Sequence, residues 1–513
     1  MKQTPLLLGL WILAAGLSAE TTSPLNMHAP PIDESRLASL RKSKIEFATI
    51  TSVAYVTDST KSTPNGRVEA HIPPRTIVKM VLNPTRGSNI KVEIWLPDNA
   101  QWNGRFLGLG NGGAAGSIHE GGLIKGVSSG YATATTDMGT AAGPHSGIDN
   151  QEVWKDFGFR ATHLMTVTSK QLIESYYGKP PRFSYFSGGS TGGQQALQEA
   201  QRYPEDYDGI LAMVPAHART PLHAYFLWNH QILLNTPFTP SQEANIIAAA
   251  NDYMADREIP GIAGHFISDP RATQKDIEGV IALAQAKDPS LTPAHAEALQ
   301  KLFDGPRHAV TGERIFNGVP FGSTFSNAHG HLYLFYWVFG SKTNLMTLNF
   351  GDDFDTYTAA LAPFLNAENA DLRAFAKRGG KMIMVSGSAD SIVPYHATLD
   401  YYERVTENFG DIDKVSSFLK FYLIPGMTHS GSYEFQQPKN LLEALIDWRE
   451  QDLAPEALLS RKIEDKKVVI EMPIYPYPTK TIWDESTSSY QPVEGPRRGV
   501  DRIAEDFRPA AAE

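Results

Sequence analysis

Short apolar runs recur along this chain, and small or polar residues follow them. The runs that have the length of a buried strand lie at 91–97, 130–137, 182–187, 207–214, 381–385 and 417–424. Helix-like segments lie between some of them, at 157–177 and 193–203. Strands that alternate with helices predict an α/β fold.

The pattern differs in two other parts of the chain. Residues 20–45 form a polar leader that contains prolines, and residues 46–100 alternate between apolar and polar positions up to the run 91–97. This alternation predicts half-buried strands at the edge of a sheet. Farther along, Ala- and Gln-rich helical stretches such as 293–302 alternate with loops.

A glycine-rich pentapeptide connects the predicted strand 182–187 to the predicted helix 193–203. Its sequence, Gly188-Gly189-Ser190-Thr191-Gly192, fits the Gly-x-Ser-x-Gly nucleophile elbow, in which a serine occupies a sharp strand-to-helix turn. The residues two positions from the serine must lack side chains to avoid clashes, and both are glycines here. In a chain with 42 glycines a turn without function is the alternative, but the flanking strand and helix favour the elbow.

Two further residues follow predicted strands in the order that this motif requires, which is serine, acid, histidine. Asp390 comes shortly after the run 381–385, and His429 lies in a glycine-containing loop after the run 417–424. Each alone would be interpreted as a turn aspartate or a surface histidine. Together with Ser190 they predict a catalytic triad, in which Ser190 attacks a carbonyl carbon, His429 transfers the proton and Asp390 orients the imidazole ring.

An oxyanion hole needs two backbone N–H groups near the serine. The residue after the nucleophile supplies the first, which is Thr191 here. The second must come from an earlier loop, and the apolar run at 106–109 leads into a series of glycines. We expect Gly113 to be the donor, with Gly112 as the next candidate and a turn without function as the alternative.

The chain between Ser190 and Asp390 is far longer than a strand and a helix or two require, so the sequence predicts a large insertion. The expected organisation is a hydrolase core interrupted by a lid. Its parts are a signal peptide at 1–19, the first part of the core at 20–219, the lid at 220–372, the second part of the core at 373–490 and a C-terminal tail at 491–513.

Several of these motifs together resemble the tannase and feruloyl esterase family, over about residues 45–480. The similar segments are 102–113, 156–161, 184–193, 199–209, Asp390 with Tyr401-Tyr402, 425–429 and Asp447-Trp448. The resemblance implies an α/β-hydrolase core with a large lid. It also implies a carboxylic ester hydrolase acting on aromatic acyl groups, since the family includes tannin acyl hydrolases, feruloyl and chlorogenate esterases and a mono(2-hydroxyethyl) terephthalate hydrolase.

The chain departs from the family at two cysteine positions. Members usually have one cysteine just before the nucleophile and one just after the histidine, joined as a disulfide. Here these positions are Gly189 and Ser430, and the chain has no cysteine. We therefore expect packing or hydrogen bonds to hold the His429 loop, and activity that is indifferent to reducing agents.

A second departure concerns calcium, which many members bind in an acidic loop of the lid. Asp252, Asp256 and Asp269 remain as candidate ligands, but proline, glycine and alanine occupy the positions between them where further oxygen ligands would be needed. We expect no required cofactor, with a structural calcium in the lid as the alternative. We find no zinc-type spacing, and His217, His223 and His230 are expected to serve packing or a hinge.

The lid is expected to select the substrate. Its densest aromatic stretch, 331–339, is a candidate wall for an aromatic acyl pocket, and packing within the lid is the alternative for each of its residues. The segment 221–229 is placed similarly at the expected hinge. A lid arginine such as Arg271, Arg307 or Arg314 would suit a carboxylate or a phenolate, but the sequence does not distinguish among them.

Composition narrows the remaining choices. The 513 residues, 42% of them hydrophobic, suffice for a large core, and a net charge of −10 argues against a nucleic-acid partner. A positive residue, a short apolar stretch and small residues at 1–19 predict a cleaved signal peptide, with no stable membrane anchor and a periplasmic or secreted protein. A retained anchor is the alternative. The expected partner is a small aromatic ester. The sequence does not fix the oligomeric state.

These observations predict a serine carboxylic ester hydrolase of the tannase and feruloyl esterase type. Two alternatives come from other classes. One is another serine acyl-transfer enzyme, an amidase or an acyltransferase, because the same triad serves esters and amides. The other is a non-catalytic binding protein on a hydrolase fold, which the loss of any triad residue would have favoured.

Overall fold

A computed structural model describes residues 34–62, 68–254, 273–431, 437–484 and 486–495. The expected signal peptide and nearly all of the expected C-terminal tail lie outside these residues. Within the part that is described, no helix is both long and apolar enough to cross a membrane.

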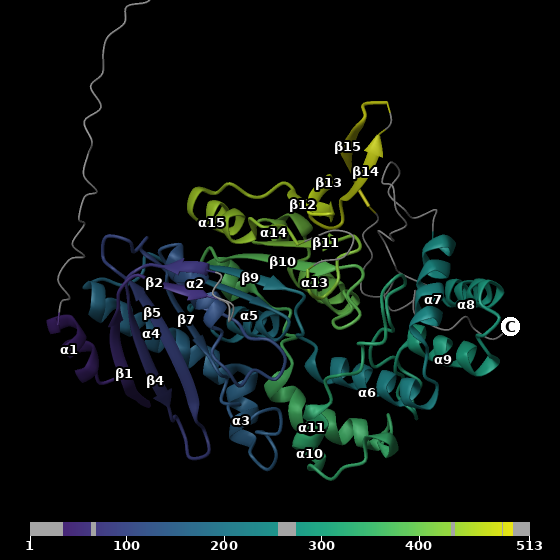
Figure 1. The fold of residues 1–513 in the computed structure, drawn as a ribbon, viewed down its shortest axis with the longest axis horizontal. Coiled ribbons are helices and arrows are strands. Elements are labelled where there is room, and N and C mark those ends of the chain that lie inside the picture. The colour runs from purple at the N-terminus through teal and green to yellow at the C-terminus, as the bar shows by residue number, and fades with distance from the viewer. Residues whose placement is uncertain (1–33, 63–67, 255–272, 432–436, 485, 496–513) are drawn as a thin grey trace, which may run out of the picture.

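The core of the molecule is a mixed sheet whose strands run in the order β1-β4-β5-β7-β6-β8-β9-β10-β11 (Figure 1). The pairs from β1 to β7 are antiparallel, and those from β7 to β11 are parallel. The strand bounds are β1 Ala48–Val56, β4 Arg75–Leu82, β5 Ile90–Pro97, β6 Arg105–Leu109, β7 Ala132–Thr136, β8 Phe183–Gly189, β9 Gly209–Met213, β10 Lys381–Gly387 and β11 Leu419–Ile424.

Helices cover both faces of this sheet, so successive residues of a strand enter different cores. A separate hydrophobic cluster lies on each face. In β8, Tyr185 belongs to one of these two clusters and Phe186 to the other. The helices α2 (Glu120–Ser128) and α15 (Leu441–Gln451) contribute to the cluster of Tyr185, whereas α4 (Ala161–Tyr177), α5 (Thr191–Arg202) and α13 (His396–Phe409) contribute to that of Phe186. Burial on both faces explains why the parallel strands are continuous apolar runs.

The strands expected from the apolar runs are present as β5 and β7 to β11. The expectation that 91–97 is a half-buried edge strand is wrong. β5 lies inside the sheet between β4 and β7, and all of its residues after Lys91 are buried. Its two faces are covered by α2 and α4. The alternation of burial belongs to β1, which lies at one edge of the sheet beside β4.

The helix expected at 157–177 is present as two segments. A π-helical segment, η1 (Asp156–Arg160), precedes α4. A Cβ atom added to Gly158 would lie 2.2 Å from the carbonyl oxygen of Phe364, so the glycine lets this turn pack directly on α11 (Asp352–Leu365). The glycine of the motif 156–161 is therefore needed for a contact with a distant segment.

Between β9 and β10 the described residues form several helices joined by loops. The helices are α6 Arg219–Asn235, α7 Pro240–Tyr253, α8 Gln274–Lys287, α9 Pro293–Asp304, α10 Tyr333–Phe339, the 3₁₀ turn η3 Leu345–Thr347, α11, and α12 Arg373–Lys377. In Figure 1, α7 to α9 lie at the end of the molecule opposite α1 (Glu34–Lys42). Buried residues of α6 to α9 form a hydrophobic cluster of their own. The domain boundaries stated above stay a prediction.

Glutamines of α5 attach this helical region to the core. The amide groups of Gln194, Gln198 and Gln201 donate to backbone carbonyls of residues 364–367, where α11 ends and the chain returns toward the sheet. Buried polar groups need hydrogen-bond partners. The carbonyls of residues 364–367 are those partners, so the glutamine-rich face of α5 can be buried.

The remaining elements lie at the periphery. They are the hairpin β2 Ser59–Ser62 with β3 Val68–Ile72, the short helices α3 Gln151–Lys155 and α14 Ile412–Ser416, the hairpin β12 Leu458–Glu464 with β13 Lys467–Ile474, and the hairpin β14 Lys480–Asp484 with β15 Ser489–Val493.

Candidate active site

Ser190 occupies the turn between β8 and α5 in a backbone conformation that is rare for a residue with a side chain. Its φ is 58° and its ψ is −117°. Its N–H donates to the carbonyl of Met213 at 3.0 Å, and its carbonyl accepts from Ala216 at 3.0 Å. These bonds to the segment after β9 hold the strained turn in place.

The glycines around Ser190 are sterically required to different degrees. A Cβ atom on Gly188 would lie 2.4 Å from the carbonyl oxygen of Gly192, whereas one on Gly192 would meet Gly110 Cα at 3.1 Å. A Cβ atom on Gly110 would lie only 2.5 Å from Gly192 Cα. The elbow therefore packs backbone against backbone on the end of β6.

Asp390 and His429 meet at the carboxyl end of the sheet. His429 Nδ1 lies 2.8 Å from Asp390 Oδ2, and the backbone N–H groups of Ile392 and Val393 donate to Asp390 Oδ1 at 2.9 and 2.8 Å. Asp390 is fully buried. A carboxylate accepts hydrogen bonds, so Nδ1 carries the imidazole proton and Nε2 is left as the acceptor.

Opposing effects act on the pKa of His429. Burial lowers it, but the negative charge of Asp390 and the hydrogen bond to that carboxylate together outweigh burial and raise the pKa above its ordinary value. The imidazole is thus a stronger base than an isolated buried histidine.

Hydrogen bonds join the His429 loop to the end of β10. The N–H of Gly426 donates to Ser388 Oγ at 2.8 Å, and the N–H of Ala389 donates to the carbonyl of Met427 at 3.1 Å. Met427 is fully buried. These contacts hold the loop in a chain that has no cysteine.

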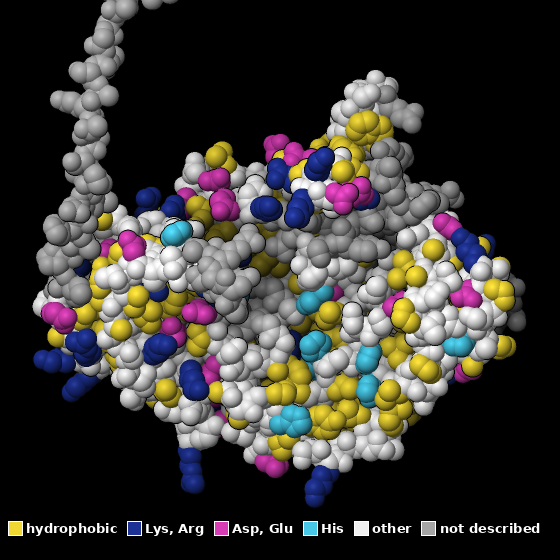
Figure 2. Space-filling model, in the orientation of Figure 1, with side chains coloured by type: hydrophobic (Ala, Val, Ile, Leu, Met, Phe, Trp, Pro, Cys, Tyr) yellow, Lys and Arg dark blue, Asp and Glu magenta, His cyan; other side chains and the backbone are white. Residues whose placement is uncertain are grey.

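Ser190 lines a pocket at the place where the core meets the helical region. Its lining residues are Gly113, Ser190, Thr191, Ala216, Arg219, Leu222, His223, Phe226, His331, Ile392 and Val393. We call it the Ser190 pocket. Ile392 and Val393 follow the loop of Asp390, whereas Leu222 and Phe226 belong to α6. Figure 2 shows histidine side chains gathered over the middle of this face of the molecule.

The two expected oxyanion donors, Thr191 and Gly113, line the Ser190 pocket together with Ser190. Thr191 is the first residue of α5, so its N–H has no acceptor within the helix. Gly112 faces a different hollow, which Asn111, His119 and Glu120 also line. Gly113, the preferred candidate, therefore lines the same pocket as Ser190, whereas Gly112 lines a different one.

Arg219 is the site residue that the sequence did not reveal. It begins α6, is 3% exposed, and donates to Thr191 Oγ1 at 3.1 Å and to the Gly113 carbonyl at 3.2 Å. Arg307 and Arg314, proposed from the sequence as substrate ligands, both pair with Asp304, and Arg271 lies outside the described residues. No local motif marks Arg219, because its role depends on contacts with three separate segments.

His223 and His331 line the Ser190 pocket as neutral groups. Burial lowers the pKa of both, and the charge of Arg219 lowers each further. His429 also lowers the pKa of His331, which places the expected general base within electrostatic reach of this pocket. His223 therefore has a place in the pocket wall beyond the packing role expected for it.

The aromatic stretch 331–339 contributes mainly to the interior. Tyr333, Phe335 and Trp337 are buried in the large hydrophobic cluster, and Trp337 donates to the carbonyl of Pro144 at 2.7 Å. His331 alone of this stretch lines the Ser190 pocket. Packing, the alternative stated for these residues, describes most of them.

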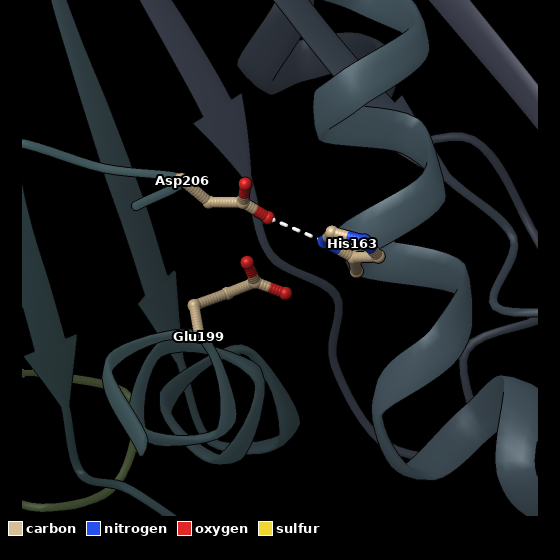
Figure 3. A group of neighbouring side chains, drawn as sticks. All are labelled: His163, Glu199 and Asp206. Carbon is tan, nitrogen blue, oxygen red and sulfur yellow. Dashed lines mark hydrogen bonds and ion pairs between the residues drawn. The ribbon is translucent and has the colours of Figure 1, made fainter. Parts of the chain in front are cut away.

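One group of side chains in the described residues has the composition to hold a metal ion. His163, Glu199 and Asp206 lie together near the end of α5 farther from Ser190 (Figure 3). His163 Nδ1 lies 2.6 Å from Asp206 Oδ2. The positive charge of Lys170 also acts on Glu199, and the Lys170 ammonium donates to the backbone carbonyl of Asp206, so side chains already supply positive charge there.

The candidate calcium ligands are only partly placed. Asp252 pairs with Lys287, which gives this carboxylate a partner within the helical region. Asp256 and Asp269 lie outside the described residues. The expectation of no required cofactor stays a prediction.

Comparisons of the sequence and of the structure with known proteins lead to the same family. The family model described as tannase and feruloyl esterase matches residues 76–338 and 338–493. Feruloyl esterase B from Aspergillus niger is 30% identical over 75% of this chain and 79% of its own length.

Two solved structures share the fold at lower identity. Feruloyl esterase B from Aspergillus oryzae has a TM-score of 0.75 at 22% identity, covering 89% of this chain and 100% of that one. Tannin acyl hydrolase from Aspergillus niger has a TM-score of 0.74 at 18% identity, covering 92% and 96%. The α/β-hydrolase fold expected from the sequence is confirmed.

Proposed function

Because the chain belongs to the tannase and feruloyl esterase family and is a carboxylic ester hydrolase, we propose that it cleaves esters of aromatic acids with Ser190 as the nucleophile. The observation that carries this proposal is the pairing of His429 Nδ1 with the buried Asp390 carboxylate at 2.8 Å, at the same edge of the sheet as the strained Ser190.

In the proposed reaction, Ser190 Oγ attacks the ester carbonyl carbon while His429 Nε2 accepts the hydroxyl proton. The negative charge that forms on the carbonyl oxygen is bound by the N–H groups of Thr191 and Gly113. His429 then gives the proton to the leaving alkoxide, and an acyl-enzyme remains. Water attacks the acyl carbon while His429 accepts its proton. The bond between that carbon and Ser190 Oγ then breaks as His429 returns the proton to Oγ, which releases the acid and regenerates Ser190.

The lining of the Ser190 pocket supports an aromatic acyl group. Phe226, Leu222, Ile392 and Val393 supply apolar walls beside the two proposed oxyanion donors. An aromatic ring buried between such side chains gains hydrophobic and ring-stacking energy. We place the acyl group here and the alcohol in the neighbouring hollow that contains Asn111 and Glu120.

The test is hydrolysis of methyl gallate, methyl ferulate, methyl caffeate and mono(2-hydroxyethyl) terephthalate by the purified protein and by Ser190→Ala. We expect turnover of at least one ester, lost in Ser190→Ala and retained in the control Ser187→Ala, which changes a serine of β8 that does not line the pocket. An amide of the same acid measures the alternative activity. Equal turnover by Ser190→Ala would exclude the proposed nucleophile.

We also propose that the chain is exported to the periplasm or the medium, on the basis of the leader pattern at 1–19. The mature protein is then expected to begin after Ala19, which intact-mass measurement of the exported fraction checks. A full-length chain retained in the cell would contradict this.

A further inference from the structure

Arg219 joins the two proposed oxyanion residues in a closed hydrogen-bond network. Its guanidinium donates to the hydroxyl groups of Thr191 and Tyr333, at 3.1 and 2.5 Å. Each of these hydroxyl groups donates in turn to the carbonyl of Gly113, at 2.7 and 3.3 Å, and Arg219 Nη2 donates to the same carbonyl at 3.2 Å. Every hydroxyl thus accepts from the arginine and donates to Gly113, so all the donor and acceptor roles are consistent.

The network brings together three parts of the chain. Gly113 lies in the loop after β6, Thr191 begins α5, and Tyr333 begins α10. Gly113 also has a φ of 55°, a left-handed conformation that fixed neighbours must maintain. Because three donors converge on its carbonyl, the loop is held at a defined place beside Ser190. An oxyanion hole acts through donors that are already in position before the charge develops.

The positive charge of Arg219 is buried at the Ser190 pocket. Among the residues that the structure describes, no carboxylate lies within ion-pair distance of Arg219, and its buried Nε has no hydrogen-bond partner. The guanidinium lies over the ring of Phe157, 5.2 Å from its centroid. A buried charge without a counter-charge destabilises a fold. A negative charge formed at the neighbouring oxyanion hole during the reaction would balance it.

We propose that Arg219 is a positioning residue for the Gly113 and Thr191 amides, and that its charge stabilises the oxyanion formed on the substrate. The proposal rests on the proposed function. Arg219 acts through the two residues that it holds and through its electrostatic field, which extends across the Ser190 pocket. Burial lowers the pKa of His223 and His331 in that pocket, and the charge of Arg219 lowers each further, which shows that its field reaches them.

The experiment compares Arg219→Met, which removes the charge and the donors, with Arg219→Lys, which keeps the charge. The control is Arg202→Met, because Arg202 also lies over an aromatic ring, that of Phe159 at 4.5 Å, but at the far end of α5. With the best ester of the panel, we expect kcat to fall about 100-fold or more in Arg219→Met, less in Arg219→Lys and little in the control, with KM nearly unchanged.

A second readout separates this role from a merely structural one. Phenylboronic acid adds to a nucleophilic serine and forms a tetrahedral anion that resembles the oxyanion intermediate. We expect its Kd to rise in Arg219→Met by about the same factor as kcat/KM falls. A change in KM alone, or an unchanged boronate Kd beside a lowered kcat, would overturn the proposal.

Two safeguards keep the test decisive. If Arg219→Met does not fold, Tyr333→Phe removes one bond to the Gly113 carbonyl while keeping the charge, and the same parallel loss of kcat/KM and boronate affinity is expected on a smaller scale. Failure of the proposed function is distinguishable, since the unmodified protein would then hydrolyse no ester and Ser190→Ala would change nothing.

Discussion

Each oxygen of the Asp390 carboxylate has its own task. Oδ1 accepts two backbone N–H groups, and Oδ2 faces the ring N–H of His429. An asparagine with its carbonyl oxygen toward the backbone donors would turn its NH₂ group toward His429 Nδ1. The ring would then carry its proton on Nε2, where it cannot accept a proton from Ser190.

Asp390→Asn is therefore expected to lower kcat by about three to four orders of magnitude with little change in fold. The basic form of His429 is the active one, so activity should rise with pH through the pKa of His429, which the unmodified protein holds above its ordinary value. Loss of the Asp390 charge lowers that pKa, so the rising limb of the residual activity should move to lower pH. The pH profile of kcat/KM tests this, and an unmoved limb would contradict it.

At the scale of single elements, α5 carries Ser190 at one end and a buried acid near the other. Both carboxylate oxygens of Glu199 are buried, and they lie near Asp206 and His163 (Figure 3). Burial and the nearby charge of Asp206 raise the pKa of Glu199 well above its ordinary value. The helix is thus sensitive to the ionisation of a group that takes no part in the proposed reaction.

The raised pKa of Glu199 makes the fold less stable as the pH rises. Above the ordinary pKa of a glutamate the unfolded chain releases its proton while the folded chain keeps it, so the free energy of unfolding falls by up to about 1.4 kcal/mol per pH unit until the folded pKa is passed. Glu199→Gln cannot ionise. We expect the variant to gain stability relative to the unmodified protein between pH 5 and pH 9.

Thermal unfolding of both proteins at the two pH values, with and without EDTA, provides the measurement. An equal difference in Tm at pH 5 and pH 9 would contradict the ionisation of Glu199. A loss of Tm caused by EDTA only in the unmodified protein would instead indicate a bound cation at this cluster.

This chain has no cysteine at the two positions where the family resemblance places a disulfide between the loops of Ser190 and His429. A Cβ atom at Gly189 would meet its nearest neighbour, the carbonyl oxygen of Met213, at 3.6 Å, which is ordinary contact. This position, unlike Gly188, tolerates a side chain. The glycine therefore reflects no steric need, and the family resemblance places a cysteine there.

The double variant Gly189→Cys with Ser430→Cys is accordingly expected to form a disulfide. Oxidised protein should be more stable than the unmodified chain by about 2–4 kcal/mol, and dithiothreitol should remove the gain. Denaturant unfolding in both redox states measures it. Each single variant is a control, and the activity of the unmodified protein should not respond to dithiothreitol. A double variant whose cysteines stay reduced under oxidation would show that the two loops are too far apart.

At the scale of the whole molecule, the Ser190 pocket exists only because the helical region closes over the core. Phe226 of α6 lies beside His223 and His331, with ring centroids 5.4 and 5.3 Å away, and all three line the pocket. The segment after β10 adds Ile392 and Val393 to the lining. Selectivity for the acyl group should depend on this wall more than on the reacting residues.

Phe226→Leu keeps an apolar wall but removes the ring. We expect kcat/KM for an aromatic acyl ester to fall about 2- to 10-fold relative to the acetate ester of the same alcohol, since an aromatic pair contributes about 0.5–1.5 kcal/mol. The control is Phe325→Leu, which alters a buried ring of the helical region outside the pocket. An equal loss for both esters would mean that Phe226 supports the fold and not the selectivity.

The sequence by itself determined the elements with a local cause. Continuous apolar runs are buried on both faces, so β8, β10 and β11 could be found without a structure, and their carboxyl ends indicated Ser190, Asp390 and His429. The elbow glycines follow from the sterics of one tight turn. The expected edge position of β5 was wrong because strand order depends on pairing with β4 and β7, which local alternation does not encode.

Tertiary structure alone decided the surroundings of these residues. Arg219 has no local motif, and its importance comes from contacts with Gly113, Thr191 and Tyr333, which lie far apart along the chain. The burial of Glu199 and the position of His331 in the wall of the Ser190 pocket likewise depend on which segments pack together. A hydrogen bond or a lowered pKa arises from neighbours in space, and the sequence specifies those neighbours only through the complete fold.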